Sequence, residues 1–485
     1  MAVNAGDRRA GSEWSLTVVA VAYFFFVICS YYVIKPIRGS LALELGSANI
    51  PVLNIFSMIS LVIANAVYSW IVGKYKRDIF IPFITRFFVV CLAIFWCVFT
   101  FVIPINQGKA VPKSAEVVTD RVITAENADA FSADNTEDSS PGKPLSEAKP
   151  EFLGIIKTVL IGSYYLWVNF FSLMAVSMFW SFMNDVFTVE QGRRLYAIIG
   201  YGGLIGGLVG SGLTSLLVHR VGTFNLLILA IILLYPSIWC MQYIHRNHYR
   251  PEGIVNVDNK PVVPAHPPRP WDGFLSVSKN PILICMALEM FLYTFSSTMF
   301  FQQLNRLIEN EIGSDVNGRT MFIAGLYGKI NIVSLFSQFF VTRLMMMMPN
   351  PIYGLLLLNL VQVVGTSLTF FNPSLLVASW VVIIRYALDY STGRALRELV
   401  YIPLGREAKY QGKGFIDTVV FRIGDGLSSL ILIGGIGFYS YGTWIDYSIQ
   451  LAMLIQFYVI IKTAGLYGQR LKTAQTSDTT PVPAS

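Results

Sequence analysis

The sequence predicts an all-α integral membrane protein with twelve transmembrane helices in two halves of six. Apolar residues make up 54% of the 485-residue chain, charged residues only 13%, and the mean hydropathy is +0.56. A soluble chain averages about 25% charged residues. In addition, twelve segments are long and apolar enough to cross a bilayer, and Lys and Arg gather in alternate short connections. These observations indicate one membrane body and not several soluble domains.

Each predicted helix is a stretch of about 20 predominantly apolar residues, the length that spans the hydrocarbon core. The first follows the polar N-terminus without the small-residue cleavage pattern of a signal peptide. In chain order, the spans are expected at residues 14–35, 51–73, 79–104, 156–184, 195–218, 224–244, 280–303, 320–346, 351–371, 374–402, 415–438 and 443–465.

Basic residues in the connections predict the orientation of these helices. Lys and Arg are concentrated on one side, at residues 73–78, 190–194, 245–250 and 405–413, whereas the longest connection is acidic. That connection, residues 105–152, is predicted to be an extracytoplasmic insert whose composition is typical of disorder. We therefore expect a multi-pass protein of the cell inner (plasma) membrane with both termini in the cytoplasm.

The order of the spans divides the chain into two halves. The N-terminal six-helix half is predicted at residues 1–244 and the C-terminal six-helix half at 279–470. A Pro-rich cytoplasmic linker at 245–278 joins them, and residues 471–485 are expected to be a disordered tail. This is the plan of a major-facilitator-type carrier, and carriers built from repeats bind substrate near the midplane between the repeats.

Charged residues within the spans are candidates for function, because lipid does not solvate them. Three oppositely charged pairs have the spacing that allows contact on one helix face: Arg385 with Asp389, Arg394 with Glu398, and Arg422 with Asp425. Internal ion pairs that stabilise the fold are the simpler explanation for the first and third. The candidates for coupling or gating are Asp185, Glu289, Asp389, Arg385, Arg77 and Asp78.

Two basic clusters resist that explanation. Lys35 and Arg38 lie three residues apart in one half, and Arg394 and Arg397 lie three apart in the other. Together they can bind a multiply charged anion such as a polyphosphate, since Arg offers bidentate forks and Lys a compact charge. On these residues alone, a binding site and a structural role explain the clusters equally well. The aromatic residues that can add contacts to substrate or base, or serve only in packing, are Tyr32, Tyr390 and Tyr401.

Other function classes lack their residues in this sequence. The four histidines lie in predicted loops, and the five cysteines lie in apolar segments without a CxxC pair, so neither a metal site nor a disulfide framework is expected. The spans contain no HExxH motif and no nucleophile–base pair, so an enzyme is not predicted. The sequence indicates no cofactor, no nucleic-acid partner and no obligate protein partner. The predicted partners are an anionic small molecule and the lipid bilayer.

Three stretches resemble the ATP:ADP antiporter family, the nucleotide exchangers of plastids and intracellular bacteria. They are "YYVIKPIRGSLAL", "FWSFMNDVFTVEQGRRLYAIIGYGG" and "RELVYIPLGREAKYQGKGFIDTVVFRIGDG". The third stretch keeps the family pattern E-x-x-Y-I-P-L…K-x-x-G-K-x-x-I-D without a gap. The resemblance implies nucleotide transport and places the family's basic residues on Lys35, Arg38 and Arg397, with Lys413 and Asp417 matching its K-x-x-I-D pair.

The sequence therefore predicts an alternating-access carrier of an organic anion, with nucleotide exchange of the ATP/ADP type as the main hypothesis. An alternative is a proton- or ion-coupled symporter of a different anionic metabolite, with Asp185, Glu289 or Asp389 as the proton carrier. An alternative of another class is a membrane sensor or scaffold that does not transport.

Overall fold

The structure is a computed structural model that describes residues 3–74, 77–102, 150–187, 189–248, 272–348, 350, 352–401, 404, 412–435 and 443–478. These residues form helices joined by short turns, with no strand among them. The helices before the linker are α1 (Val3–Leu43), η1 (Ser47–Asn49), α2 (Ile50–Lys74), α3 (Arg77–Phe101), α5 (Pro150–Val186), α6 (Val189–Val221) and α7 (Leu226–His248). Those after it are α8 (Asp272–Lys279), α9 (Pro281–Ile312), α10 (Val316–Phe339), α11 (Val341–Met346), α12 (Tyr353–Phe371), α13 (Leu375–Leu388), η2 (Asp389–Gly393), α14 (Arg394–Tyr401), α15 (Lys413–Phe415), η4 (Ile416–Val420), α16 (Phe421–Gly435) and α17 (Thr443–Asp478).

Ten helical stretches in the described part are long and apolar enough to cross a membrane. They correspond to ten of the predicted spans, and the all-helical membrane fold is confirmed. The other two predicted spans are also helical. The span 51–73 falls on α2, and the span 415–438 falls on η4 and α16, of which α16 is described only to Gly435. The count of twelve spans stays a prediction.

Most residues of the three predicted non-helical regions lie outside the described part. These residues are 105–149 of the insert, 249–271 of the linker and 479–485 of the tail. The described edges of all three regions are helical: α5 begins at Pro150, α7 continues to His248, α8 covers Asp272–Lys279 and α17 continues to Asp478. The assignment of halves to residues 1–244 and 279–470 stays a prediction.

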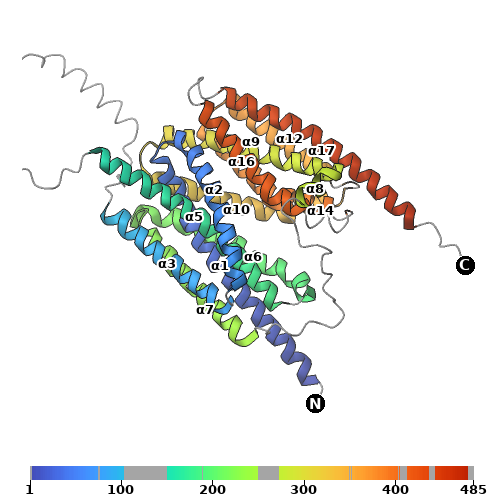
Figure 1. Cartoon of the computed structure of the whole chain (residues 1–485), viewed down its shortest axis with the longest axis horizontal. Helices are drawn as coiled ribbons and strands as arrows, with labels where there is room; N and C mark the ends of the chain where they lie inside the picture. Colours follow the sequence, from blue (N-terminus) through green and yellow to red (C-terminus); the bar gives the residue numbers. More distant parts are fainter. Residues whose placement is uncertain are drawn as a thin grey trace, which may run out of the picture.

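The helices form two groups that meet along a central interface. In Figure 1 the blue-to-green helices α1–α7 gather on one side and the yellow-to-red helices α9–α17 on the other, while α10 packs against α1 and α6. Glycines of α6 allow close packing against α1: a β-carbon on Gly206 would lie 2.6 Å from the carbonyl oxygen of Phe25. At the central interface between the two groups, α16 packs against α2.

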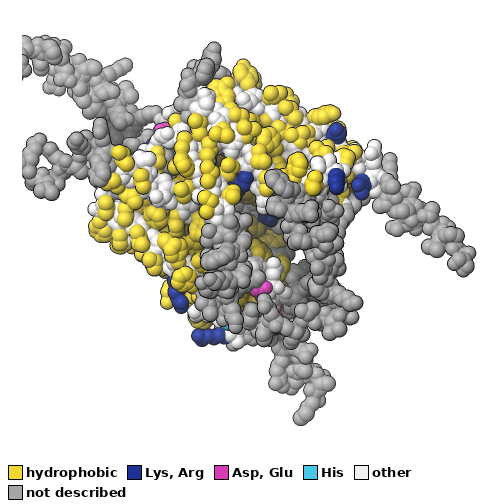
Figure 2. Space-filling model, in the orientation of Figure 1, with side chains coloured by type: hydrophobic (Ala, Val, Ile, Leu, Met, Phe, Trp, Pro, Cys, Tyr) yellow, Lys and Arg dark blue, Asp and Glu magenta, His cyan; other side chains and the backbone are white. Residues whose placement is uncertain are grey.

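The outer surface is apolar, as expected for helices in contact with lipid. Figure 2 shows hydrophobic side chains over most of the visible face. Large side chains that a soluble protein would bury are exposed on several helices, among them Phe83 on α3, Leu216 on α6 and Phe371 on α12. Together with the ten apolar helices, this surface identifies a multi-pass membrane protein.

Polar contacts close one end of the interface between the two groups. Glu44, just after α1, accepts from Arg319 of α10 at 3.2 Å and from Lys157 of α5 at 2.9 Å. Next to this cluster, the Ser47 amide donates to the Glu309 carboxylate at 2.9 Å. The side chains of Arg319 and Glu44 are only 5% and 10% exposed, so this ion pair is shielded from solvent.

Candidate functional site

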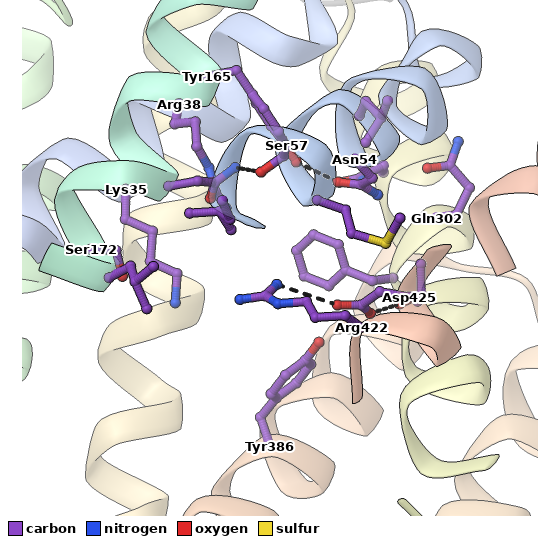
Figure 3. A pocket seen from close by; sticks show the side chains of 18 of the residues that line it. Lys35, Arg38, Asn54, Ser57, Tyr165, Ser172, Gln302, Tyr386, Arg422 and Asp425 are labelled. Atoms are coloured by element: carbon purple, nitrogen blue, oxygen red, sulfur yellow. Dashed lines mark hydrogen bonds and ion pairs between the residues drawn. The ribbon is translucent and has the colours of Figure 1, made fainter. Parts of the chain in front are cut away.

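A cavity of about 550 Å³ lies between the two groups of helices. Its walls come from α1, α2 and α5 on one side and from α9, α10, α13, η2 and α16 on the other. The volume falls in the range of about 300–1,000 Å³ that is usual for small-molecule sites. Figure 3 shows polar and charged side chains from both groups arranged around this space.

Three cations and one carboxylate line the cavity, which leaves two net positive charges. Lys35 and Arg38 come from α1, where their spacing places them on one helix face, and Arg422 comes from α16 across the interface. The carboxylate is Asp425, which lies 3.9 Å from Arg422 in the predicted i,i+3 pair and accepts from Thr298 Oγ1 at 2.6 Å. The predicted Arg422–Asp425 pair is therefore confirmed.

Lys35 and Arg38 have no carboxylate within ion-pair distance among the described residues, and aromatic rings and an amide surround them instead. The Lys35 ammonium lies 3.9 Å from the Tyr327 ring centroid and 5.2 Å from that of Tyr32. The Arg38 guanidinium lies 4.9 Å from the Tyr165 ring centroid and donates to Asn169 Oδ1, while its Nε is buried without a hydrogen-bond partner. Rings stabilise these charges only weakly, so both cations remain available to an anion.

The rest of the wall provides hydrogen-bonding groups and aromatic faces. Tyr165 donates to Asn54 at 2.7 Å, and Asn169 donates to Ser57 at 2.7 Å, so these side chains hold one another in place. Three further tyrosines contribute rings on which a planar group can stack; they are Tyr327, Tyr386 and Tyr390. The cavity can therefore bind an anion through its cations and an attached aromatic group through its tyrosines.

Arg397 lies outside this cavity, in a second buried cluster. Its guanidinium contacts Asp389 at 2.5 Å and Glu289 at 3.6 Å. Glu289 also accepts from Gln456 Nε2 at 3.4 Å. The side chains of Arg397, Glu289 and Asp389 are only 12%, 3% and 11% exposed, so the cluster is shielded from solvent.

The structure thus separates the two predicted basic clusters. Lys35 and Arg38 line the cavity, but Arg397 is neutralised by two carboxylates and Arg394 is exposed and lines neither site. Of the predicted aromatic contacts, Tyr390 lines the cavity and Tyr32 lies beside Lys35. The third, Tyr401, is buried, and the Lys413 ammonium lies 5.7 Å from its ring centroid.

Two predicted helix pairs are wrong. Arg385 does not pair with Asp389; instead it is buried and donates to the backbone oxygen of Tyr293 at 3.2 Å and to the Ser296 hydroxyl at 3.1 Å. Asp389, the first residue of the π-helical turn η2, pairs with Arg397 instead.

Glu398 likewise does not pair with Arg394. Its carboxylate accepts from Lys413 at 2.7 Å. Both partners belong to the family pattern in the third resembling stretch, so this contact gives Lys413 a structural role. Among the predicted gating residues, Arg77 and Asp78 begin α3, and Asp185 lies half-buried near the end of α5 without lining the cavity.

Comparison with known proteins relates the chain to nucleotide carriers. Residues 323–468 match the family model described as TLC ATP/ADP transporter. The chain is 25% identical to ADP,ATP carrier protein 1 of Chlamydia pneumoniae over 59% of this chain and 63% of that carrier. It is 22% identical to ADP,ATP carrier protein 2 of Chlamydia pneumoniae over 87% of this chain and 82% of that carrier. The predicted relationship to the ATP:ADP antiporter family is confirmed.

The family match covers α10 to α17 and so includes Arg397 and Arg422 but not the α1 cations. The match to ADP,ATP carrier protein 1 of Chlamydia pneumoniae covers less than two thirds of that carrier's length. The matched family is one of membrane transporters and not of enzymes, as predicted.

Solved structures show the fold. A bacterial homologue of the iron transporter ferroportin, in an inward-facing state, aligns with a TM-score of 0.59 at 10% identity and covers 93% of this chain and 99% of that one. A bacterial homologue of the human lysosomal transporter Spinster, inward-facing and unoccupied, aligns with a TM-score of 0.50 at 11% identity and covers 98% and 99%. The fold is therefore of the major-facilitator-like transporter type.

Arg422 and Asp425 are cavity residues that the sequence alone did not identify as a site. Their spacing gave them the simpler explanation of a structural pair, and the pair does form. The signal available in the sequence was the presence of two charged residues, Arg422 and Asp425, in an apolar segment. Only the structure shows that they lie across the interface from Lys35 and Arg38.

Proposed function

We propose that the protein is an alternating-access carrier that exchanges nucleotides of the ATP/ADP type across a membrane. The supporting observation is the cavity between the two helix groups, with two net positive charges and tyrosine rings on its wall. Phosphates would contact Lys35, Arg38 and Arg422, and the base would lie against the tyrosines. The similarity to Chlamydia ADP,ATP carriers favours this substrate class over other organic anions.

Exchange, as opposed to one-way transport, follows from the charge of the empty cavity. Occluding two unneutralised positive charges in a low-dielectric interior is costly, whereas a bound polyphosphate cancels them. The empty carrier would therefore change conformation slowly and the loaded one quickly. The closed end around Glu44 and Arg319 would have to open during each cycle.

The first test is ligand-dependent thermal stabilisation of the purified carrier by ATP, ADP, GTP, NAD, phosphate and simple sugars, since a ligand of the folded state raises the melting point with its concentration. Lys35→Ala, Arg38→Ala and Arg422→Ala should each weaken nucleotide binding by about 10- to 100-fold, because a hydrogen bond to a charged group contributes about 1.5–3 kcal/mol.

Two control variants sharpen this test. Lys329→Ala removes an exposed cation of α10, 5.8 Å from the Trp380 ring centroid and outside the cavity, and should leave binding unchanged. Asp425→Asn removes the carboxylate of the cavity and should strengthen binding. Absence of stabilisation by every nucleotide would refute the proposed substrate class.

Exchange is tested in vesicles that hold preloaded nucleotide. Efflux should require a counter-nucleotide on the other side, and free efflux into nucleotide-free buffer would refute the exchange mechanism while leaving the substrate class intact.

The orientation and the division into halves are parts of the same proposal. Residues 245–278 would join the halves in the cytoplasm, both termini would lie on that side, and the insert 105–152 would lie outside. Single cysteines placed in the linker and the insert should react with a membrane-impermeant thiol reagent from opposite sides of intact cells. Reaction of both from the same side would refute this orientation.

A further inference from the structure

A second, much smaller cavity lies inside the C-terminal helices, against the Arg397 cluster. Its volume of about 10 Å³ is the size of a single water molecule or small ion. Helices α9, α12, α14 and α17 and the turn η2 surround it. No organic substrate fits in this space, so it is a different kind of site from the large cavity.

The wall of this small cavity has an excess of unsatisfied hydrogen-bond acceptors. Glu289, Asn359, Gln362 and Gln456 are 2%, 2%, 7% and 3% exposed. Glu289 Oε2, Asn359 Oδ1, Gln362 Oε1 and Gln456 Oε1 all lack a hydrogen-bond partner, and the one unpaired donor is Asn359 Nδ2. Buried polar groups are almost always paired, so four unpaired acceptor oxygens around one small space favour an occupant that is positive or donates protons.

The local charge indicates the same occupant. Glu289 and Asp389 carry two negative charges and Arg397 carries one positive charge, which leaves one net negative charge. Arg385 forms no ion pair with either carboxylate; its guanidinium donates to the backbone oxygens of Tyr293 and Ser296 and to the Ser296 hydroxyl. The remaining titratable groups packed close to the cluster are Tyr293, Tyr401 and Asp417.

We propose that this small cavity is an occluded site for one monovalent cation, bound by Glu289 together with the side-chain oxygens of Asn359, Gln362 and Gln456. Oxygen donors of this kind suit a hard cation. The same single charge can be supplied by a sodium ion or by a proton on the Glu289 carboxyl group. Either one satisfies the free oxygens and cancels the net negative charge of the cluster.

The turn η2 connects this cation site with the large cavity. Asp389 belongs to the Arg397 cluster, whereas its neighbour Tyr390 lines the large cavity. A π-helical turn is rare and frequently marks a functional site. Hydrogen bonds hold the turn against α10, with Ser391 donating to Ser337 at 2.8 Å. The turn is therefore the element through which cation binding at Glu289 would act on the large cavity; this coupling rests on the proposed function, whereas cation binding does not.

The sodium arm of the test uses the full-length carrier in detergent at pH 8 with no nucleotide present. Thermal stability is titrated with sodium chloride against potassium and choline chloride at constant ionic strength. Sodium should raise the melting point saturably. Glu289→Gln should abolish the effect, and the matched control Glu398→Gln, which alters the exposed partner of Lys413, should retain it.

The proton arm applies if no salt stabilises the carrier. Infrared difference spectra between acid and alkaline pH should then show the carbonyl band of a buried protonated carboxyl group. Glu289→Gln should remove that band, and Glu398→Gln should keep it. Each arm identifies one source of the same charge.

Asn359→Leu keeps the test valid if loss of Glu289 prevents folding. It removes two unsatisfied buried atoms and no charge, so the fold should tolerate it. It should shift the sodium midpoint, or the pH midpoint of the Glu289 band, by a factor of roughly ten, as loss of a supporting group does at metal sites. The proposal would be overturned if the carrier showed no sodium-specific stabilisation and no Glu289-dependent band. An unchanged midpoint in Asn359→Leu would also overturn it. A carrier that binds sodium but no nucleotide would refute the proposed function and not the cation site.

Discussion

Replacing Arg397 with methionine should destabilise the protein strongly without damaging the large cavity. Arg397 is held by Asp389 at 2.5 Å and Glu289 at 3.6 Å and does not line the space between the two helix groups. The resemblance to the antiporter family placed a basic binding residue at this position. In the structure its guanidinium forms ion pairs with two buried carboxylates, and we infer that it serves to neutralise them.

The expected loss follows from the burial of the cluster. Breaking a buried ion pair by removing one partner costs about 3–5 kcal/mol, since the other charge stays in a poorly solvated site. All three side chains are largely buried, and the two carboxylates lose the one cation that pairs with them among the described residues, so we expect a value near the upper end of that range. Proton uptake by one carboxylate limits the loss.

The assay compares the midpoint of thermal unfolding at one scan rate for the wild type, Arg397→Met, and a compensated variant. The compensated variant combines Arg397→Met with Glu289→Gln and Asp389→Asn and leaves no charge behind. It should recover stability to within about 1 kcal/mol of the wild type, because neutral replacement of a buried ion group is often tolerated.

Nucleotide affinity then separates the two possible roles of Arg397. The compensated variant should bind ADP within a factor of about three of the wild type, whereas Arg38→Ala should bind about 10- to 100-fold more weakly. A compensated variant that is stable but fails to bind ADP would refute the assignment of Arg397 to structure. It would show that Arg397 reaches the nucleotide in a state other than the one described.

Three further perturbations test other parts of the structure. Glu44→Gln removes the carboxylate that holds the buried Arg319, so the closed end should loosen and the amides of η1 should exchange hydrogen faster; unchanged exchange would contradict its role in closure. Gly206→Val places a β-carbon 2.6 Å from an α1 carbonyl oxygen and should cost about 1–3 kcal/mol in thermal stability, whereas Gly212→Ala, which meets nothing within 4 Å, should not. Arg38→Lys keeps the charge but loses the bidentate fork, so ADP affinity should fall by roughly tenfold; an unchanged affinity would contradict bidentate binding.

The sequence predicts the membrane helices well because hydropathy over about 20 residues is a local property. It also finds Lys35 and Arg38, since two cations in an apolar segment without an acidic neighbour require an explanation from outside that segment. Both line the large cavity. These predictions succeed because they depend on a single helix and its solvent.

Charge pairs between helices could not be predicted in the same way. Glu289 is 108 residues before Arg397 in the chain, so no local pattern relates them. The helix pairs 385/389 and 394/398 were expected from regular helical geometry. They do not form because both acidic partners find more distant cations: Asp389 pairs with Arg397 and Glu398 with Lys413. Arg422 shows the converse case: its local pair forms, yet the same residue also faces the cavity from the opposite side of the interface.

The two buried sites have opposite net charge, and this difference suggests how transport can be controlled. The large cavity holds two net positive charges until an anion binds, and the small cavity holds one net negative charge until a cation binds. Occlusion is favourable only when buried charge is compensated, so the carrier with both sites filled is the form best suited to pass through a closed state. Because η2 contributes to both sites, it is the element through which filling one would affect the other. A nucleotide exchanger with this arrangement would respond to the cation content of its surroundings even though the cation never touches the nucleotide.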